Sequence, residues 1–210
     1  MVNFMSKKSV WIFKSKTQMI VSIILFVIFL IGFIYIGTVD FSNNNIDDNI
    51  KIAEEYKDIL DKDNIYQYTN AQFINDYIRS DDVIVLFGIK NSEWVGYYAN
   101  ILNLIAKENN IDSIYYYDIT DDRDNKNGTY QSIVNYLSDY VTHLDDGTIN
   151  IYGPTLLIKK NGKVIYFDDS TAFISGNISA SDYWNEYQTN LQKLTLRAVL
   201  KDYVGGENGK

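Results

Sequence analysis

The chain has 210 residues, of which 19 are basic, 27 are acidic, one is histidine and none is cysteine, so its formal charge is −8. The absence of cysteine excludes disulfide bonds and every form of thiol chemistry. An acidic chain also lacks the basic surface with which proteins bind nucleic acid, so we expect no nucleic-acid partner.

The first 39 residues differ sharply from the rest. They contain four lysines and no acidic residue, whereas the other 15 basic residues and all 27 acidic ones follow, which gives residues 40–210 a charge of −12. Residues 19–37 are uncharged and apolar, and at about 1.5 Å per residue a helix of this length spans the hydrocarbon core of a bilayer. The run is longer than the apolar region of a cleaved signal peptide, which is the alternative interpretation. We therefore predict an uncleaved anchor with a cytoplasmic N-terminus, because lysines remain inside.

The prediction divides the chain into a basic cytoplasmic tail, a transmembrane signal-anchor helix, a spacer with an amphipathic helix, one folded domain and a flexible tail. These parts cover residues 1–18, 19–37, 38–64, 65–204 and 205–210. A domain of this size can bury a core of its own. The expected location is the outer face of a cell membrane, and the abundance of Asn, Ile, Lys and Tyr is typical of an AT-rich, Gram-positive bacterium. The lipid bilayer is then a partner only through the anchor.

Hydrophobic periodicity predicts helices that alternate with strands along the chain. In chain order we expect a helix over 52–60, a strand over 65–68, a helix over 69–78, a strand over 83–88, a helix over 92–108, a strand over 113–119, an exposed loop over 121–128, a helix over 129–144, strands over 155–160 and 163–167, and a helix over 179–204. The strand over 83–88 is continuously apolar, which indicates burial on both faces. Asn161-Gly162 between the last two strands predicts a tight hairpin.

The periodicity also predicts which face of the last helix is buried. Its apolar residues recur at spacings of three and four: Tyr183, Tyr187, Leu191, Leu194, Ala198 and Val199. Ser179 with Asp182, or Ser181 alone, can cap the start of this helix, and Thr69 or Asn70 can cap the helix over 69–78. The acidic loop lacks the ligand spacing of a calcium loop, and the single histidine has no cysteine beside it. We therefore expect no metal site and no cofactor.

The segment "YGPTLLIKKNGKVI", residues 152–165, contains the only proline of the chain. Together with the order β-α-β-α-β-α-β-β-α, it resembles the thioredoxin family, in which a cis-proline precedes a core strand and a hairpin follows. The resemblance covers about residues 65–203. It implies an α/β, thioredoxin-like fold, a central mixed sheet flanked by helices with an extra helix before the final hairpin. It also implies a cis bond between Gly153 and Pro154, which costs little before proline.

The resemblance also implies where the family's Cys-x-x-Cys motif would stand. Those two positions are occupied by Ser92 and Val95, and the buried acid of many thioredoxins aligns near Leu86. A helix dipole contributes at most about 2 kcal/mol, too little to ionise a serine hydroxyl, so Ser92 is better interpreted as a helix N-cap. We expect a degenerate active site and no thiol–disulfide oxidoreductase activity.

What remains of the family's site is a surface for binding. The resemblance implies that an extended peptide of a protein partner binds at Gly153, Pro154 and Thr155, within a redox-inactive accessory or adaptor module. Trp94 belongs either to this recognition surface or to the core. An alternative is a glutathione-transferase-like enzyme or thiol-compound binder that uses Ser92. Against it, no helical second domain and no basic group near the loop can be found in the sequence.

Overall fold

The computed structural model describes residues 47–174 and 177–205 of the chain. The predicted membrane anchor, residues 19–37, lies outside the described residues. Within them, no helix combines the length and the apolar character needed to cross a membrane.

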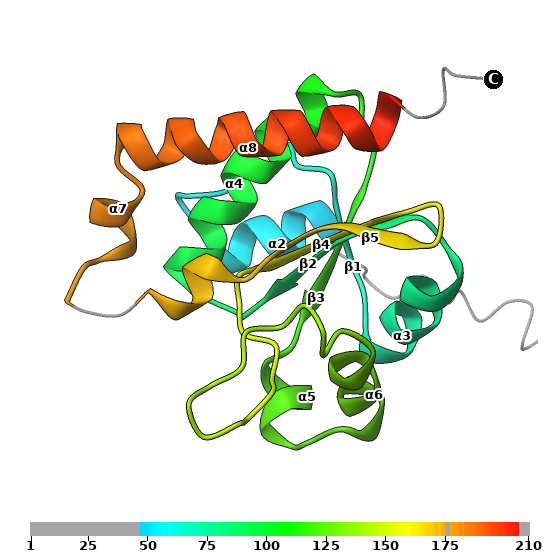
Figure 1. Ribbon diagram of the computed structural model, residues 1–210. Coiled ribbons are helices and arrows are strands. Elements are labelled where there is room, and N and C mark those ends of the chain that lie inside the picture. Colours follow the sequence, from blue (N-terminus) through cyan, green and yellow to red (C-terminus); the bar gives the residue numbers. More distant parts are fainter. Residues whose placement is uncertain (1–46, 175–176, 206–210) are drawn as a thin grey trace, which may run out of the picture. The chain divides into compact units, whose positions relative to one another are not determined.

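The described part of the chain alternates between helices and strands (Figure 1). The strands are β1 (Tyr66–Tyr68), β2 (Val83–Gly88), β3 (Ile114–Asp118), β4 (Thr155–Lys160) and β5 (Lys163–Asp168). The helices are α2 (Asp48–Glu55), α3 (Ala71–Ser80), α4 (Glu93–Glu108), α5 (Thr120–Asp124), α6 (Gly128–Tyr136), α7 (Ala180–Tyr183) and α8 (Glu186–Gly205), with the 3₁₀ helix η1 at Ser170–Phe173.

The five strands form one mixed sheet in the order β1-β3-β2-β4-β5. β3 pairs in parallel with both β1 and β2, whereas β4 runs antiparallel to β2 and β5. The predicted α/β class is thus confirmed, and the mixed sheet with flanking helices is compatible with a thioredoxin-like fold.

Helices cover both faces of the sheet, and each face has its own apolar core. α2, α4 and α8 pack on one face, and α3 and α6 pack on the other (Figure 1). Every residue of β2 is buried, as its continuous apolar run predicted. Because side chains alternate along a strand, Leu86 and Tyr116 belong to the first core, and Val85 and Tyr117 belong to the second.

The local signals for caps and turns act as their chemistry predicts. The side chain of Asn70 accepts a hydrogen bond of 3.0 Å from the backbone N–H of Phe73 and begins α3. Asn161 and Gly162 have φ angles of 50° and 76° and close the β4–β5 hairpin. Positive φ at both central residues is the geometry that an Asn-Gly pair favours.

Two sequence predictions between β3 and β4 are wrong. Residues 121–128 were expected to form a loop, but α5 occupies the first half of them, because Asp118 accepts hydrogen bonds from the backbone and hydroxyl of Thr120 and stabilises a first turn. α6 ends at Tyr136 instead of reaching residue 144. The helical hydrogen-bond pattern is lost at Ser138, whose backbone N–H donates to the carbonyl of Asn135, and further on the N–H of Thr142 donates to the Asp169 side chain.

The predicted helix over 179–204 is also two helices with a different buried face. Asn185 separates them, since its side chain accepts from the N–H of Gln188 and starts a new helix. The predicted inner residues Tyr187, Leu191 and Leu194 are 72, 50 and 64% exposed, whereas Leu196 and Leu200 are fully buried. The lateral contacts of α8 fix this orientation, namely the hydrogen bond from Gln192 to Tyr98 and the ion pair of Arg197 with Glu108.

Candidate functional site

The candidate site lies where β2 and β3 end and the chain turns into α4. Open α/β sheets place ligands at the carboxyl ends of their parallel strands. Three segments meet here: the loop of residues 89–92, the turn at Gly153–Pro154, and the end of α2 at Glu55 and Tyr56. We call them together the carboxyl-end site.

The Gly153–Pro154 peptide bond is cis, as the resemblance implied. Gly153 lies directly against the loop, since a Cβ atom placed on it would be 3.0 Å from the carbonyl carbon of Gly88 and from the nitrogen of Ile89. Its backbone N–H and C=O make no hydrogen bond to any residue that the structure describes. Thr155 is fully buried, and its hydroxyl donates to the carbonyl of Tyr152. The backbone groups of Gly153 are therefore among the free polar groups of this turn.

Ser92 and Val95, which the resemblance aligns with a Cys-x-x-Cys motif, have different environments. Ser92 occupies the N-cap position of α4, as predicted, but its hydroxyl accepts no hydrogen bond from the helix. Val95 and Leu86 are completely buried in the first core. Trp94 is half-buried and packs against the ring of Tyr183 in α7, with 5.2 Å between ring centroids. Trp94 thus combines core packing with partial exposure.

Two tyrosines, Tyr56 and Tyr116, support the loop of residues 89–92 through their hydroxyl groups. Gly88 makes room for the ring of Tyr116, because a Cβ at position 88 would lie 2.4 Å from that ring. The Tyr116 and Tyr56 hydroxyls are 2.5 Å apart, and Tyr56 donates to the carbonyl of Ile89 at 3.0 Å. Tyr116 must then donate to Tyr56, since each hydroxyl has a single proton. Burial raises the pKa of both tyrosines, so they remain neutral donors.

Glu55 is the unusual residue of the site. Its side chain is only 6% exposed, and both carboxylate oxygens are buried without a hydrogen-bond partner among the described residues. The ammonium of Lys90 lies 3.9 Å from Oε1, which is too long for a hydrogen bond. Burial raises the pKa of Glu55, Lys90 opposes that shift and Asp118 adds to it. An unpaired buried carboxylate destabilises a fold.

Charges of both signs surround Glu55. Asp118, at the end of β3, accepts from the hydroxyl of Thr120 at 2.6 Å and from that of Tyr68 at 3.4 Å. Lys51 lies 3.3 Å from the centre of the Tyr68 ring, a cation–π contact. The Tyr68 hydroxyl also lies near Glu55 and lowers the pKa of that carboxyl, so Tyr68 and Lys90 are among the groups that offset its burial.

Sequence reasoning missed Glu55, Lys90 and Asp118. A weak signal existed for Asp118, because a carboxylate directly after a buried parallel strand is expected at the ligand-binding edge of the sheet. No signal marked Glu55, which stands beside an exposed glutamate in a segment of ordinary amphipathic pattern. Its burial depends on how α2 packs against the loop.

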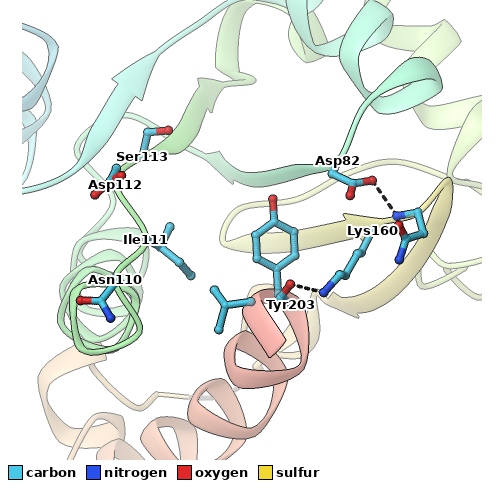
Figure 2. Close-up of a pocket in the computed structure, with 9 residues that line it drawn as sticks. Asp82, Asn110, Ile111, Asp112, Ser113, Lys160 and Tyr203 are labelled. Atoms are coloured by element: carbon cyan, nitrogen blue, oxygen red, sulfur yellow. Dashed lines mark hydrogen bonds between the residues drawn. The ribbon is translucent and has the colours of Figure 1, made fainter. Parts of the chain in front are cut away.

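A larger cavity lies elsewhere, at the opposite end of the sheet (Figure 2). It measures about 390 Å³ and has Asp82, Ile111, Lys160 and Tyr203 among its lining residues. Two hydrogen bonds join groups that line it: Asp82 accepts from the backbone N–H of Asn161 at 2.6 Å, and Lys160 donates to the carbonyl of Tyr203. This pairing indicates a structural role. Within the described residues, no group of three acidic or histidine side chains could hold a metal ion.

Comparison with protein-family models, with curated proteins and with solved structures finds no match for this chain.

Proposed function

We propose that the chain is a membrane-anchored, redox-inactive, thioredoxin-like protein that binds an extended segment of a partner protein at the carboxyl-end site. The observation that carries the proposal is the backbone of Gly153, whose N–H and C=O are unpaired beside the loop of residues 89–92. Buried backbone groups are nearly always paired within the fold, whereas unpaired groups at a surface are open to hydrogen bonds with water or with the backbone of a ligand.

An extended peptide is the ligand that fits this arrangement. Its own N–H and C=O groups match those of Gly153, as in the addition of a strand to a sheet edge. The loop of residues 89–92 and the cis turn at Gly153–Pro154 flank the point of contact. They admit only a peptide whose side chains are small at that point. Alternate side chains of the peptide then point toward the two flanking helices, α2 and α4.

The same geometry favours binding over catalysis. Val95 is buried and has no reactive group. The Ser92 hydroxyl has no described residue hydrogen bonded to it that could act as a base. A serine nucleophile requires such a base within hydrogen-bonding reach. We therefore assign the role of an accessory or adaptor module, which the predicted anchor at residues 19–37 keeps at the outer face of the membrane.

Site-specific photocrosslinking in intact cells tests the proposal. A benzoylphenylalanine placed at Tyr152, next to Gly153, should form an adduct with a partner. The matched control is the same group at Tyr187, which is exposed on α8. Gly153→Ala should suppress the adduct at position 152, because its methyl group would meet Gly88 and Ile89 at 3.0 Å and push the turn away from the loop. Equal adducts at both positions, or none at position 152, contradict the proposal.

A further inference from the structure

A second apolar stripe runs along α8 on the side that faces away from the domain. Its members are spaced four, three and four residues apart: Tyr187, Leu191, Leu194 and Ala198. At about 100° per residue they lie opposite Leu196, which is buried in the first core. The side chains of the first three are at least half exposed, and Ala198 is exposed as well. We call these four residues the α8 stripe.

The spacing of the α8 stripe is that of a seam between paired helices. Coiled-coil helices carry apolar residues at alternating intervals of three and four, which keeps these residues in line along one side of the helix. A helix that packs only on its own domain needs a single apolar face. The face of α8 that packs on α4 is the opposite one (Figure 1), so the described domain gives the stripe no partner. A row of exposed large apolar side chains marks an interaction site.

The stripe is complementary to itself when two copies run antiparallel. A two-fold axis midway between Leu191 and Leu194 places each of these leucines against the other leucine of the second copy. The same axis places the large ring of Tyr187 over the small side chain of Ala198, so that the two surfaces can pack closely. Parallel pairing would instead oppose the two tyrosines and leave the two alanines facing each other across a gap.

The charges at the two ends of the stripe favour the same orientation. Glu186 and Lys201 are exposed and lie on the same side of the stripe, one near its first residue and one near its last. Antiparallel pairing brings each lysine next to the glutamate of the second copy, whereas parallel pairing brings the two lysines together. Opposite charges beside a helical seam set the orientation of the partner in this way.

A protein partner fits the residues beside the stripe better than a lipid surface does. Helices that lie in a membrane interface carry many lysines and arginines next to their apolar face. Two of the three basic residues of α8, Lys193 and Arg197, lie near Glu108 of α4 instead. Uncharged polar residues border the stripe, Asn190 on one side and Thr195 on the other. Such a border is typical of the polar rim of a protein–protein interface.

We infer that the chain forms a two-fold symmetric dimer through the α8 stripe, with the two α8 helices antiparallel. The dimer goes beyond the proposed function and does not depend on the carboxyl-end site. Its interface is weak, because the stripe has far fewer residues than the roughly 20–30 per side of a standard interface. The charge of −12 on residues 40–210 makes two copies repel each other, so added salt should strengthen the dimer.

Disulfide trapping of the full chain in detergent tests the inference, and the absence of native cysteine makes the test specific. The variant with Tyr187→Cys and Ala198→Cys should form a covalent dimer on oxidation with copper phenanthroline, as seen on a non-reducing gel. These two positions are about 16 Å apart along one helix, too far for a disulfide within the chain. Glu93→Cys with Leu104→Cys is the matched control, because both residues are exposed and have the same spacing on α4.

A charge placed in the stripe should separate the two copies. Leu194→Glu, added to the Tyr187→Cys and Ala198→Cys variant, should reduce the trapped dimer at least about tenfold, since burial of one leucine side chain changes an equilibrium constant by that factor or more. The position is exposed in the single chain, so folding should be unaffected. Leu104→Glu in the same background is the control, because it changes an exposed leucine outside the stripe. Tyr187→Cys alone should give no dimer.

Every other outcome overturns the inference. Absence of a trapped dimer, or an equal amount from the α4 control pair, excludes pairing through the stripe. A dimer of Tyr187→Cys alone shows parallel pairing. Protection of the Tyr187→Cys thiol from a soluble maleimide without any dimer assigns the stripe to a lipid surface or to another protein.

None of these outcomes bears on the carboxyl-end site, so the proposed function is judged separately. In the photocrosslinking experiment, the control position Tyr187 should yield only an adduct of two chains, which its mass distinguishes from the adduct at position 152.

Discussion

The two ends of the sheet are both polar, yet they differ in how their polar groups are satisfied. At the end shown in Figure 2, the N–H of Asn161 meets the carboxylate of Asp82, and Lys160 meets the last carbonyls of α8. At the carboxyl-end site, the Glu55 carboxylate has the Lys90 ammonium 3.9 Å away but accepts no hydrogen bond from the described residues, and the backbone of Gly153 makes none.

This difference shows why the volume of a cavity is a poor guide to function here. The larger cavity is lined by groups that already stabilise the hairpin and the end of α8. Beside the loop of residues 89–92, the hydrogen bonding of Glu55 and Gly153 is incomplete. A ligand gains most where it completes hydrogen bonds that the fold leaves open.

The largest expected effect concerns the packing beneath the loop. Gly88→Ala should lower the free energy of unfolding by about 3 kcal/mol, the upper range for overpacking. The reason is that the new methyl group meets the buried ring of Tyr116 at 2.4 Å. Urea denaturation measures the loss. Gly128→Ala is the control, because nothing lies within 4 Å of its added methyl group. Equal stability of the two variants contradicts the packing described here.

Glu55→Gln should stabilise the protein at neutral pH by about 1 kcal/mol, because it removes a desolvated charge. The folded-state pKa of Glu55 is raised by burial, opposed by Lys90 and reinforced by Asp118. Ionisation of Glu55 therefore destabilises the fold. This destabilisation grows as the pH rises above the pKa of Glu55 in the unfolded chain, about 4.3. The stability gap between variant and parent should be absent below pH 4 and open as the pH increases to the raised pKa.

Thermal unfolding of both proteins from pH 3.5 to pH 8 measures this gap. Lys51, Lys90, Tyr68 and Asp118 also influence Glu55, and all four are present in parent and variant, so the difference isolates Glu55. The exposed neighbour provides a matched control, since Glu54→Gln should change stability little at any pH. A gap that closes toward neutral pH would contradict the burial of an unpaired carboxylate.

At the opposite end of the sheet, the sign of the effect should reverse. Asp82→Ala removes the acceptor of the 2.6 Å hydrogen bond from the Asn161 backbone and should destabilise the protein by about 1 kcal/mol. Peptide affinity should remain unchanged, because this group is remote from Gly153 in the sheet. Urea denaturation measures the stability, and isothermal titration with an extended peptide measures the affinity. A loss of affinity in Asp82→Ala would show that the two ends are not functionally distinct.

The smallest effect is expected from installing cysteines at the two degenerate positions. Ser92→Cys with Val95→Cys should form a disulfide in air, because both positions lie in the first turn of α4. Mass spectrometry with and without a reductant measures the bond. Ser92→Cys with Trp94→Cys provides a control with unsuitable spacing. Free thiols in the 92/95 pair would show that these positions do not correspond to a Cys-x-x-Cys motif.

Much of the fold could be predicted from the sequence, because its strands carry strong local signals. The run at residues 83–88 and the Asn161-Gly162 pair each determine one element almost alone. The α8 helix could not be oriented in this way. Its sequence contains one apolar stripe through Leu194 and another through Leu196, and only the contacts with α4 select the second.

Of the candidate site, the sequence predicted the backbone turn at Gly153–Pro154 but not the charged side chains. An isolated proline before an apolar strand indicated the turn at Gly153–Pro154, whose cis bond the structure contains. The charged part of the site depends on tertiary packing, since Glu54 and Glu55 are adjacent and chemically identical but only Glu55 is buried. Sequence periodicity cannot distinguish them at the last turn of a short helix.

Hydrogen–deuterium exchange of the full chain, with and without the extended heptapeptide Ac-Ser-Ala-Val-Lys-Val-Ala-Ser-NH₂, tests the central claim most directly. The account predicts slower exchange at the backbone amides of Gly153 and of residues 89–92, with no change at residues 160–163 or near Tyr203. Protection confined to the end of the sheet shown in Figure 2, or protection nowhere in the described residues, would contradict the claim that the carboxyl-end site binds an extended segment.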